Sequence, residues 1–319
     1  MTARRRDRVA LVTGGAGFVG TNLAARLIDD GHRVRIFDSL ARPGVERNLR
    51  WLLETFGDDV DVVNGDVRDR LAVRRAVDGA DQVFHLAAQV AVTTSLDDPQ
   101  TDVAVNVNGT VNLLEELRRL DDPPPLVFTS TNKVYGTLDD VRLRRRRGAW
   151  QPLDRQLVEH GVDERRPLDF CTPYGCSKGA ADQYVLDYAK SYGMPTVVFR
   201  MSCIYGPHQH GTEDQGWVAH FLIRAVDGQP ITIYGDGAQD RDLLYDDDLV
   251  EALTLARDSV GRIGGLAFNI GGGPGNAVSL LDVVDLIGEL DGRRPELLFA
   301  DERVGDQRYY VSDARRFAA

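Results

Sequence analysis

The sequence of 319 residues lacks any apolar stretch long enough to cross a membrane, and it carries only three cysteines. A membrane-spanning helix needs about 20 apolar residues in succession, so we expect no membrane partner. Cys171, Cys176 and Cys203 cannot all pair with one another, and a chain of this length buries a core without disulfide bonds. Both absences favour a protein of the reducing cytoplasm.

Negative charges outnumber positive ones, and lysine is the scarcest basic residue. The formal net charge is −11 and the isoelectric point is near 5.1. We therefore expect no nucleic-acid partner, because a phosphate backbone binds a basic face. Only three of the 38 basic residues are lysine, at positions 133, 178 and 190. A lysine in so arginine-rich a chain marks a place that a guanidinium does not suit, although we interpret Lys190 as a solvated helix residue.

Apolar runs alternate with amphipathic segments over the first 200 residues. The arginine-rich start resembles a twin-arginine signal, but its apolar run, Val9–Val12, is too short for one and predicts a strand. Further strands are expected at 34–37, 60–63, 82–86, 126–129 and 196–200, and helices at about 18–29, 45–56, 69–77, 99–119 and 174–192. This alternation predicts an α/β fold with a doubly wound parallel sheet.

The alternation breaks down after Arg200. Shorter strands are expected at 231–234, 243–245, 266–270 and 297–299, mixed with helices near 216–226, 247–257 and 279–289. We therefore predict a first domain over residues 1–203. A smaller mixed α/β domain over residues 204–319 follows and is partly interleaved with the first.

A glycine-rich stretch, GGAGFVG at residues 14–20, follows the first strand and opens the first helix. Gly14, Gly17 and Gly20 would let the backbone approach a pyrophosphate, whose charge a helix N-terminus stabilises. Asp38 ends the second strand, where its carboxylate would accept the ribose hydroxyls and repel a 2′-phosphate. The order of these features predicts a Rossmann-type domain that binds NAD. A plain glycine turn is the alternative, and the nearby Arg42 keeps NADP open.

A second pattern places a tyrosine and a lysine four residues apart. Tyr174 and Lys178 would project from one face of a helix, and the positive charge would lower the pKa of the phenol towards that of a general base. Ser130 and Thr131 end a buried strand, at the edge where open α/β sheets bind ligands. Together these residues predict a site that oxidises a carbinol with NAD. The alternative is that the hydroxyls only cap the strand.

Segments along nearly the whole chain resemble the NAD-dependent nucleotide-sugar epimerase/dehydratase family of extended short-chain dehydrogenases/reductases. They are VTGGAGFVG, Asp38, GDVRD (65–69), HLAAQ (85–89), NVNGTVNLLE (106–115), STNKVYG (130–136), PYGCSKGAADQY (173–184), YGPHQ (205–209), RDLLYDDDLV (241–250) and RVGDQR (303–308). The resemblance implies that Thr131 is the catalytic hydroxyl, Tyr174 the base and Lys178 its partner.

The same resemblance implies the binding residues. For NAD they are Gly14, Gly17, Phe18, Val19, Gly20, Asp38, Asp66, Val67, Leu86, Ala87, Ala88, Gln89, Asn106, Tyr174 and Lys178. For the nucleotide sugar they are Thr94, Ser130, Asn132, Lys133, Cys203, Gln209, Arg241 and Arg303, with the two arginines on the pyrophosphate. Cys203 departs from the asparagine that many members of the family carry there. A homodimer or a higher homo-oligomer is also expected.

The residues after Thr131 distinguish the reactions of the family. Its dehydratases carry Asp-Glu there, because elimination of water needs an acid and a base. Here the residues are Asn132 and Lys133; an amide cannot protonate a leaving hydroxyl, and a cationic lysine is a poor base. Dehydration is therefore disfavoured, and epimerisation or simple oxidation–reduction remains.

Two further segments, 89–99 and 205–221, resemble the 2-epimerases of the family that act on CDP-hexoses. They imply inversion at carbon 2 of such a sugar through a transient ketone. A 4-epimerase of UDP-sugars is the main alternative. A non-catalytic NAD-binding regulator is another, but it would be expected to lack Tyr174 or Lys178.

Other charged clusters have simpler interpretations. His208, His210, Glu213 and Asp214 could imitate a metal site, but no further ligands are evident and we expect no metal. Arg144–Arg147 predicts a solvated loop, either a flexible lid or an anion contact. Asp246, Asp247 and Asp248 begin a helix, where acidic residues favour the N-terminal dipole. His85 ends a strand and is expected to be structural.

Overall fold

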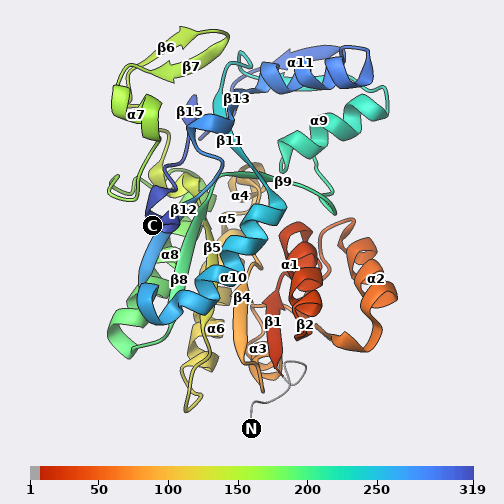
Figure 1. Ribbon diagram of the computed structural model, residues 1–319, viewed down its shortest axis with the longest axis vertical. Helices are drawn as coiled ribbons and strands as arrows, with labels where there is room; N and C mark the ends of the chain where they lie inside the picture. The colour runs from red at the N-terminus through yellow and green to blue at the C-terminus, as the bar shows by residue number, and fades with distance from the viewer. Residues whose placement is uncertain (1–7) are drawn as a thin grey trace.

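A computed structural model describes residues 8–319, and the arginine-rich start at residues 1–7 lies outside the described part. Seven parallel strands form the largest sheet, in the order β12-β8-β5-β4-β1-β2-β3 (Figure 1). The strands are β1 (Val9–Thr13), β2 (Arg33–Asp38), β3 (Val60–Asn64), β4 (Gln82–His85), β5 (Leu126–Thr131), β8 (Thr196–Met201) and β12 (Leu266–Ile270). The expected doubly wound parallel sheet is confirmed.

Helices cover both faces of this sheet. One face packs against α1, α2 and α10, which contribute Leu23, Leu52 and Leu253 to a buried core. The other face packs against α3, α6 and α8, which contribute residues such as Leu114 and Val185. Strands covered on both faces are apolar along their whole length, which is why the sequence shows them as runs. The helices are α1 (Phe18–Asp29), α2 (Val45–Phe56), α3 (Arg70–Val77), α6 (Gly109–Leu117), α8 (Thr172–Tyr192) and α10 (Asp246–Ile263).

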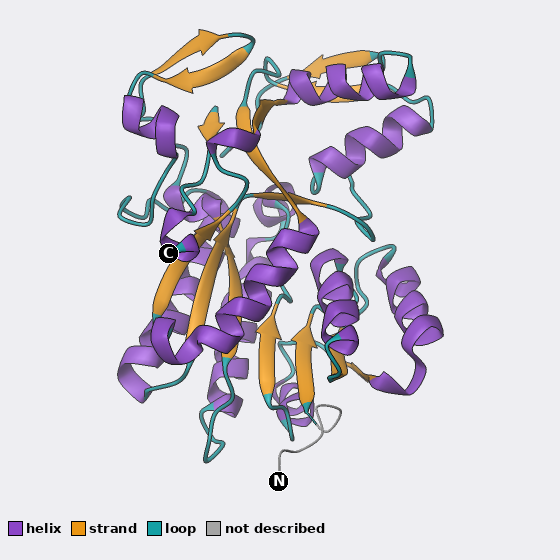
Figure 2. Cartoon of the chain, in the orientation of Figure 1, coloured by secondary structure: helices purple, strands orange, loops and turns teal. Residues whose placement is uncertain are grey.

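A smaller part of the molecule lies beyond the carboxyl ends of the main strands (Figures 1 and 2). Its central strand, β11 (Asp240–Tyr245), pairs with β9 (Cys203–Tyr205), β13 (Ala277–Ser279) and β15 (Tyr309–Tyr310). A separate pair joins β10 (Ile231–Tyr234) to β14 (Leu297–Ala300) in parallel. The helices α9 (Trp217–Val226) and α11 (Leu280–Asp291) share a small apolar core with β10. The edge at which the strands of the main sheet end therefore faces a second layer of structure.

The two parts are joined more than once along the chain. After β11 the chain returns to the main sheet as α10 and β12, and β12 pairs with β8 at one edge. It then leaves again for β13, α11 and β14. The division into domains over residues 1–203 and 204–319 stays a prediction, and so does their partial interleaving.

Short elements complete the chain. A π-helical segment, η3, runs directly into α6, and the 3-10 turn η4 directly follows β5. These elements are α4 (Val92–Asp97), α5 (Pro99–Val103), η3 (Ala104–Asn108), η4 (Asn132–Tyr135), α7 (Arg155–His160) and α12 (Arg315–Ala318), with 3-10 turns η2 (Gly57–Asp59) and η5 (Pro274–Asn276). No helix within residues 8–319 is both long and apolar enough to cross a membrane.

The run Arg144–Arg147 does not form the solvated loop that we expect from its charge. Its first three residues belong to β6 (Leu143–Arg146), which forms an antiparallel hairpin with β7 (Ala149–Pro152), and Arg147 lies in the turn. The hairpin is anchored at Asp236, which accepts a hydrogen bond from the Trp150 indole at 3.0 Å and lies 3.6 Å from Arg145. Exposed arginines are compatible with a strand here because backbone pairing, rather than side-chain burial, defines it.

Candidate active site

The glycine-rich turn between β1 and α1 is shaped by close backbone contacts. Gly14 has a φ of 68°, and a Cβ added there would lie 2.7 Å from the backbone nitrogen of Ala87. A Cβ on Gly20 would lie 2.3 Å from the Gly14 carbonyl oxygen. These two glycines are therefore required by the protein's own packing.

Gly17 is different. A Cβ there would meet only the Gly14 carbonyl oxygen, at 3.1 Å, and the φ of −71° suits any residue. Gly17 is the N-cap of α1, yet no side chain caps the first turn of this helix. The first N–H groups of α1 are therefore free to bind an anion. Gly17 has no side chain to block the approach of such a group, so the turn suits the pyrophosphate of a dinucleotide. The turn, with Phe18 and Val19 in the first turn of α1, fits NAD as expected.

Asp38 lies at the end of β2, where we expect the carboxylate that accepts the ribose hydroxyls of NAD. Its Oδ2 accepts a hydrogen bond from the backbone N–H of Ala16 at 3.1 Å, and its Oδ1 accepts one from Leu40 at 2.9 Å. Burial raises the pKa of Asp38, and these backbone hydrogen bonds oppose that rise. Each oxygen keeps further capacity to accept a ribose hydroxyl. Arg42, the residue that keeps NADP open in the sequence, donates to the Gln215 side chain at 3.1 Å.

The segment after β4 passes close to the glycine turn. The backbone of Leu86 and Ala87 donates to Thr13, at 3.1 and 3.2 Å. Ala88 and Gln89 follow, and the Gln89 backbone exchanges two hydrogen bonds with the Asn106 amide, at 2.9 and 3.1 Å. Asn106 lies in the π-helical segment η3 and is buried. It is thus a structural link that holds this segment in place.

Asp66 and Val67, which the resemblance assigns to the adenine, follow β3. The Asp66 carboxylate is engaged by Arg68 at 2.7 Å, which lowers the pKa of Asp66. The Val67 side chain packs against Gly109, and its carbonyl accepts from Asn112 at 3.0 Å. A backbone amide and an apolar side chain therefore remain for the base.

The catalytic candidates Thr131 and Tyr174 meet at the carboxyl end of β5. A hydrogen bond with Thr131 lowers the pKa of the tyrosine, but burial outweighs it and raises this pKa to about 12. From the sequence we expect Lys178 to lower the pKa of Tyr174, and the structure corrects this. The reason is desolvation, since Tyr174 is partly buried and the Lys178 ammonium hydrogen-bonds to the Thr129 carbonyl.

Lys178 lies one turn further along α8 and is 4% exposed. Its ammonium donates to the Thr129 carbonyl at 2.7 Å and lies 4.3 Å from the centre of the Phe128 ring. Burial lowers its pKa to about 7, although Asp182 and Asp102 oppose this shift. A cationic nicotinamide ring would add positive charge at this site when NAD is bound, and positive charge favours the phenolate form of Tyr174.

A cavity of about 310 Å³ opens beside this catalytic group. Asn132 and Lys133 line it from η4, Cys203 from β9, Arg241 from β11 and Arg303 from the loop before β15. Five of the eight substrate residues implied by the sequence therefore share one cavity. Its volume and its position at the sheet edge suit a nucleotide sugar.

The other three implied residues lie outside the cavity lining. Thr94 is exposed, while its neighbour Thr93 lines the cavity and has a buried hydroxyl without a partner. Ser130 is buried with an unpartnered hydroxyl, and Gln209 donates to the Ile204 carbonyl at 3.2 Å. Their roles stay predictions.

A charged network closes one wall of the cavity. The Arg241 guanidinium donates to Asp306 at 2.8 Å and to the Asp240 carbonyl at 2.9 Å. The Lys133 ammonium donates to the Gly305 carbonyl at 3.1 Å. Burial lowers the pKa of Lys133 and would raise that of Asp306, but Arg241 and Lys133 hold the pKa of Asp306 below its usual value. Asp306 is therefore a carboxylate, and it was not predicted from the sequence.

Aromatic residues also line the cavity. Arg303 lies 3.7 Å from the centre of the Tyr234 ring and donates to the Glu213 carbonyl at 2.9 Å. Trp217 donates from its indole nitrogen to the Cys203 sulfur at 3.4 Å. Trp217 and Tyr234 were missed because a single aromatic residue in a helix or strand resembles a core residue in sequence.

The histidines and acids of the 208–214 loop have protein partners. His210 hydrogen-bonds Asn48 at 3.0 Å, and Glu213 accepts from Tyr234 at 2.7 Å. No group of three metal-ligating side chains occurs within residues 8–319. His85 hydrogen-bonds two threonines and is fully buried, and burial lowers its pKa to about 3.

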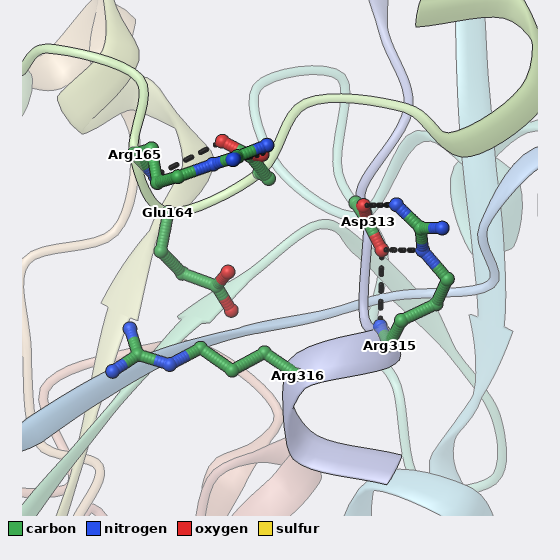
Figure 3. A pocket seen from close by; sticks show the side chains of 6 residues that line it. Glu164, Arg165, Asp313, Arg315 and Arg316 are labelled. Atoms are coloured by element: carbon green, nitrogen blue, oxygen red, sulfur yellow. Dashed lines mark hydrogen bonds and ion pairs between the residues drawn. The ribbon is translucent and has the colours of Figure 1, made fainter. Parts of the chain in front are cut away.

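A separate cavity of about 590 Å³ lies near the C-terminus (Figure 3). All six lining side chains are charged. They form local pairs, Arg165 with Asp163 and Arg315 with Asp313, while Glu164 accepts from the backbone of Asn269 at 2.8 Å. The charges balance one another, and none of the catalytic candidates lines this cavity.

Comparison with known proteins agrees with this geometry. The family model described as "NAD dependent epimerase/dehydratase family" matches residues 10–271, and the chain belongs to that family. The CDP-paratose 2-epimerase of Salmonella typhi is 42% identical over 313 residues, 96% of this chain and 91% of that protein. The dTDP-glucose 4,6-dehydratase of Streptomyces antibioticus is 32% identical over 316 residues, 96% and 84% of the two chains.

A solved structure gives the same result for the fold. The Thermus thermophilus UDP-glucose 4-epimerase in complex with NAD has a TM-score of 0.79 and 30% identity, covering 97% of this chain and 92% of its own. The family, the cofactor NAD and the class of enzyme, a nucleotide-sugar epimerase, are those predicted from the sequence, and these predictions are confirmed.

Proposed function

We propose that this enzyme inverts carbon 2 of a CDP-hexose through a transient 2-keto sugar. The observation that carries the proposal is the pair Asn132 and Lys133 directly after the catalytic candidate Thr131, in a cavity shared with Arg241 and Arg303. The similarity to the Salmonella typhi CDP-paratose 2-epimerase, which exceeds that to the dehydratase by ten percentage points of identity (42% against 32%), supports the choice of carbon and nucleotide.

The catalytic group provides acid–base chemistry. Tyr174, as phenolate, removes the proton of the sugar hydroxyl, and the Thr131 hydroxyl donates to the developing alkoxide. When bound, NAD would supply the hydride acceptor for the carbinol carbon and the hydride donor for the other face of the ketone. Tyr174 then returns its proton to the oxygen. The reaction has no net redox change, so Tyr174 and Lys178 finish in their starting protonation states.

Asn132 and Lys133 supply no acid–base pair for the loss of water. The Asn132 amide donates to the Gln307 side chain at 3.5 Å, and the Lys133 ammonium is engaged with Gly305 and Asp306. Asp306 is the carboxylate that Lys133 contacts, and Arg241 and Lys133 hold it ionised, so it does not act as the acid. Epimerisation needs neither group, because only one hydroxyl changes its protonation state.

The remaining assignments extend the proposal to binding. Arg241 and Arg303 would contact the diphosphate, while Trp217 and Tyr234 offer aromatic faces to the pyrimidine base. We further propose that the enzyme is a homo-oligomer of the cytoplasm. Light scattering on the purified protein tests whether it is a homo-oligomer.

The decisive experiment locates the inverted carbon. Purified enzyme is incubated with CDP- and UDP-hexoses that carry deuterium at carbon 2 or carbon 4, and the products are examined by NMR. We expect inversion at carbon 2 of the CDP-sugar with deuterium retained, because the hydride returns to the carbon it left. Inversion at carbon 4 of a UDP-sugar would support the 4-epimerase instead. Loss of deuterium to solvent would exclude a returned hydride.

A further inference from the structure

A buried carboxylate beneath the catalytic helix has no role in the mechanism above. Asp102, in α5, is fully buried, and its Oδ1 accepts from the Asn106 amide at 3.2 Å. Asn106 also donates to the Ser177 hydroxyl at 2.9 Å. Burial raises the pKa of Asp102, and Ser177 and the Lys178 charge oppose that rise. Ser177 directly precedes Lys178 in α8. This network therefore connects Asp102 to the residue beside the catalytic lysine.

Asp102 also has an oxygen without a partner. Its Oδ2 is buried and receives no hydrogen bond, and within residues 8–319 the carboxylate forms no ion pair. A buried charge that lacks a close counter-charge is costly. Such an arrangement is expected where the charge acts on a neighbouring group rather than stabilising the fold.

Lys178 is the cation that this charge can influence. Two carboxylates act on it, Asp182 and Asp102. Asp182 is already bound by the Arg200 guanidinium through two hydrogen bonds, at 2.9 and 3.0 Å, so its charge is largely compensated. Asp102 is the carboxylate of this pair whose charge is not compensated by a cation.

We propose that Asp102 is a positioning residue that keeps Lys178 protonated in the buried site. It acts through its charge and through the Asn106–Ser177 hydrogen bonds, and it does not touch the substrate. The role of Lys178 is that of the proposed function. The effect of Asp102 on the lysine holds whichever sugar is the substrate.

The other groups around Lys178 cannot replace this charge. On β4, His85 is neutral, because burial and the lysine charge itself lower its pKa to about 3. On β5, the Phe128 ring and the Thr129 carbonyl are dipolar contacts without net charge. On α8, Tyr174 is neutral until it acts as base, and the Asp102 charge raises the pKa of that phenol as well. Loss of Asp102 would therefore make both groups easier to deprotonate.

The chain offers a direct measurement, because it has only three lysines. Protein labelled with ¹³C at lysine Cε gives three signals, one for each lysine side chain. The signal that is absent from a Lys178→Arg variant belongs to Lys178. We expect Asp102→Asn to move the Lys178 titration to lower pH by at least about one unit. The matched control is Asp187→Asn, which removes an exposed charge from the same helix and should leave the titration unchanged.

Activity gives a second readout that purely structural damage would not produce. In Asp102→Asn the alkaline limb of the kcat profile should move to lower pH, and Asp102→Glu should restore part of the shift. If the amide variant does not fold, Asp102→Ser removes the same charge with a smaller side chain. An unshifted Lys178 titration in a folded variant, or a uniform loss of kcat at every pH, would overturn the proposal. Neither outcome depends on the carbon that is inverted.

Discussion

The Lys133 ammonium lies 3.6 Å from the Asp306 carboxylate and donates to the neighbouring Gly305 carbonyl at 3.1 Å. This contact joins the turn after Thr131, the proposed catalytic threonine, to the loop before β15, across 173 residues of sequence. Arg241 engages the same carboxylate from β11. The wall of the cavity is therefore a three-group ionic network, and a lysine, with one compact charge, fits between a carbonyl and a carboxylate.

Replacing Lys133 by methionine should weaken substrate binding more than it slows the chemistry. The apolar chain keeps the volume, but the loop at residues 303–306 loses its attachment to η4. We expect KM for the nucleotide sugar to rise about tenfold, equivalent to about 1.4 kcal/mol, with kcat changed less than threefold. Steady-state kinetics measures both constants. Lys190→Met, at an exposed position of α8, is the control and should behave as wild type.

Replacing Tyr174 by phenylalanine should abolish turnover but keep the cofactor. The phenyl ring preserves the packing, whereas proton transfer by a positioned group contributes about 10²–10⁴-fold in rate. NAD released from the denatured variant should match the wild-type amount. Tyr184→Phe, on the same helix but 46% exposed, is the control. A Tyr174→Phe enzyme with more than about a tenth of wild-type kcat would mean that another group is the base.

The glycines of the first turn should respond differently to alanine. Gly20→Ala places a Cβ 2.3 Å from a backbone oxygen that cannot move freely, so we expect a lower Tm, by about 5 °C. Gly17→Ala should lower the Tm less than Gly20→Ala, because its Cβ meets one oxygen at 3.1 Å. It should bind NAD at least tenfold more weakly, because this Cβ occupies the approach of the pyrophosphate. Calorimetry with and without NAD separates the two effects. Gly261→Ala, in an open helical position, should be neutral or slightly stabilising.

Asp246 provides a prediction about pH. It is fully buried at the start of α10, both its oxygens lack hydrogen-bond partners, and burial together with Asp247 raises its pKa to about 8. The folded protein therefore holds a proton that the unfolded chain releases near pH 4. The contribution of this group to stability falls as the pH rises from about 4 to about 8, where it levels off.

Asp246→Asn removes that dependence and should raise the Tm at pH 8 more than at pH 5. Thermal unfolding at the two pH values measures the difference, and Asp248→Asn, an exposed position in the same first turn, is the control. An Asp246→Asn protein less stable than wild type at pH 8 would show that the carboxylate has a partner in solution.

The sequence predicts the main sheet well because its central strands, β1, β4, β5 and β8, are buried on both faces. Runs such as Val9–Val12 and 126–129 appear as continuous apolar segments, and glycines mark the turn between β1 and α1. Hydroxyls at the end of β5 are likewise visible, since polar residues interrupt a buried run there. Local order of this kind is what periodicity and turn chemistry record.

What the sequence does not show depends on contacts between distant segments. The strands β9, β13 and β15 have two or three residues each, too few for any period, and the arginines of β6 are typical of a loop. Asp306 reaches Lys133 and Arg241 only once the chain has folded. The pKa of Tyr174 likewise depends on burial, which the spacing of Tyr174 and Lys178 does not reveal.

The return of β12 to the edge of the main sheet has a consequence for recombining these enzymes. A chimera joined at residue 203 would take β12 and α10 from the donor together with loops that we propose bind the sugar, so a foreign strand would have to pair with β8. Specificity therefore cannot be exchanged as a single C-terminal block. It must be transplanted loop by loop, at 89–99, 205–221 and 303–308, while the donor's edge strand is left behind.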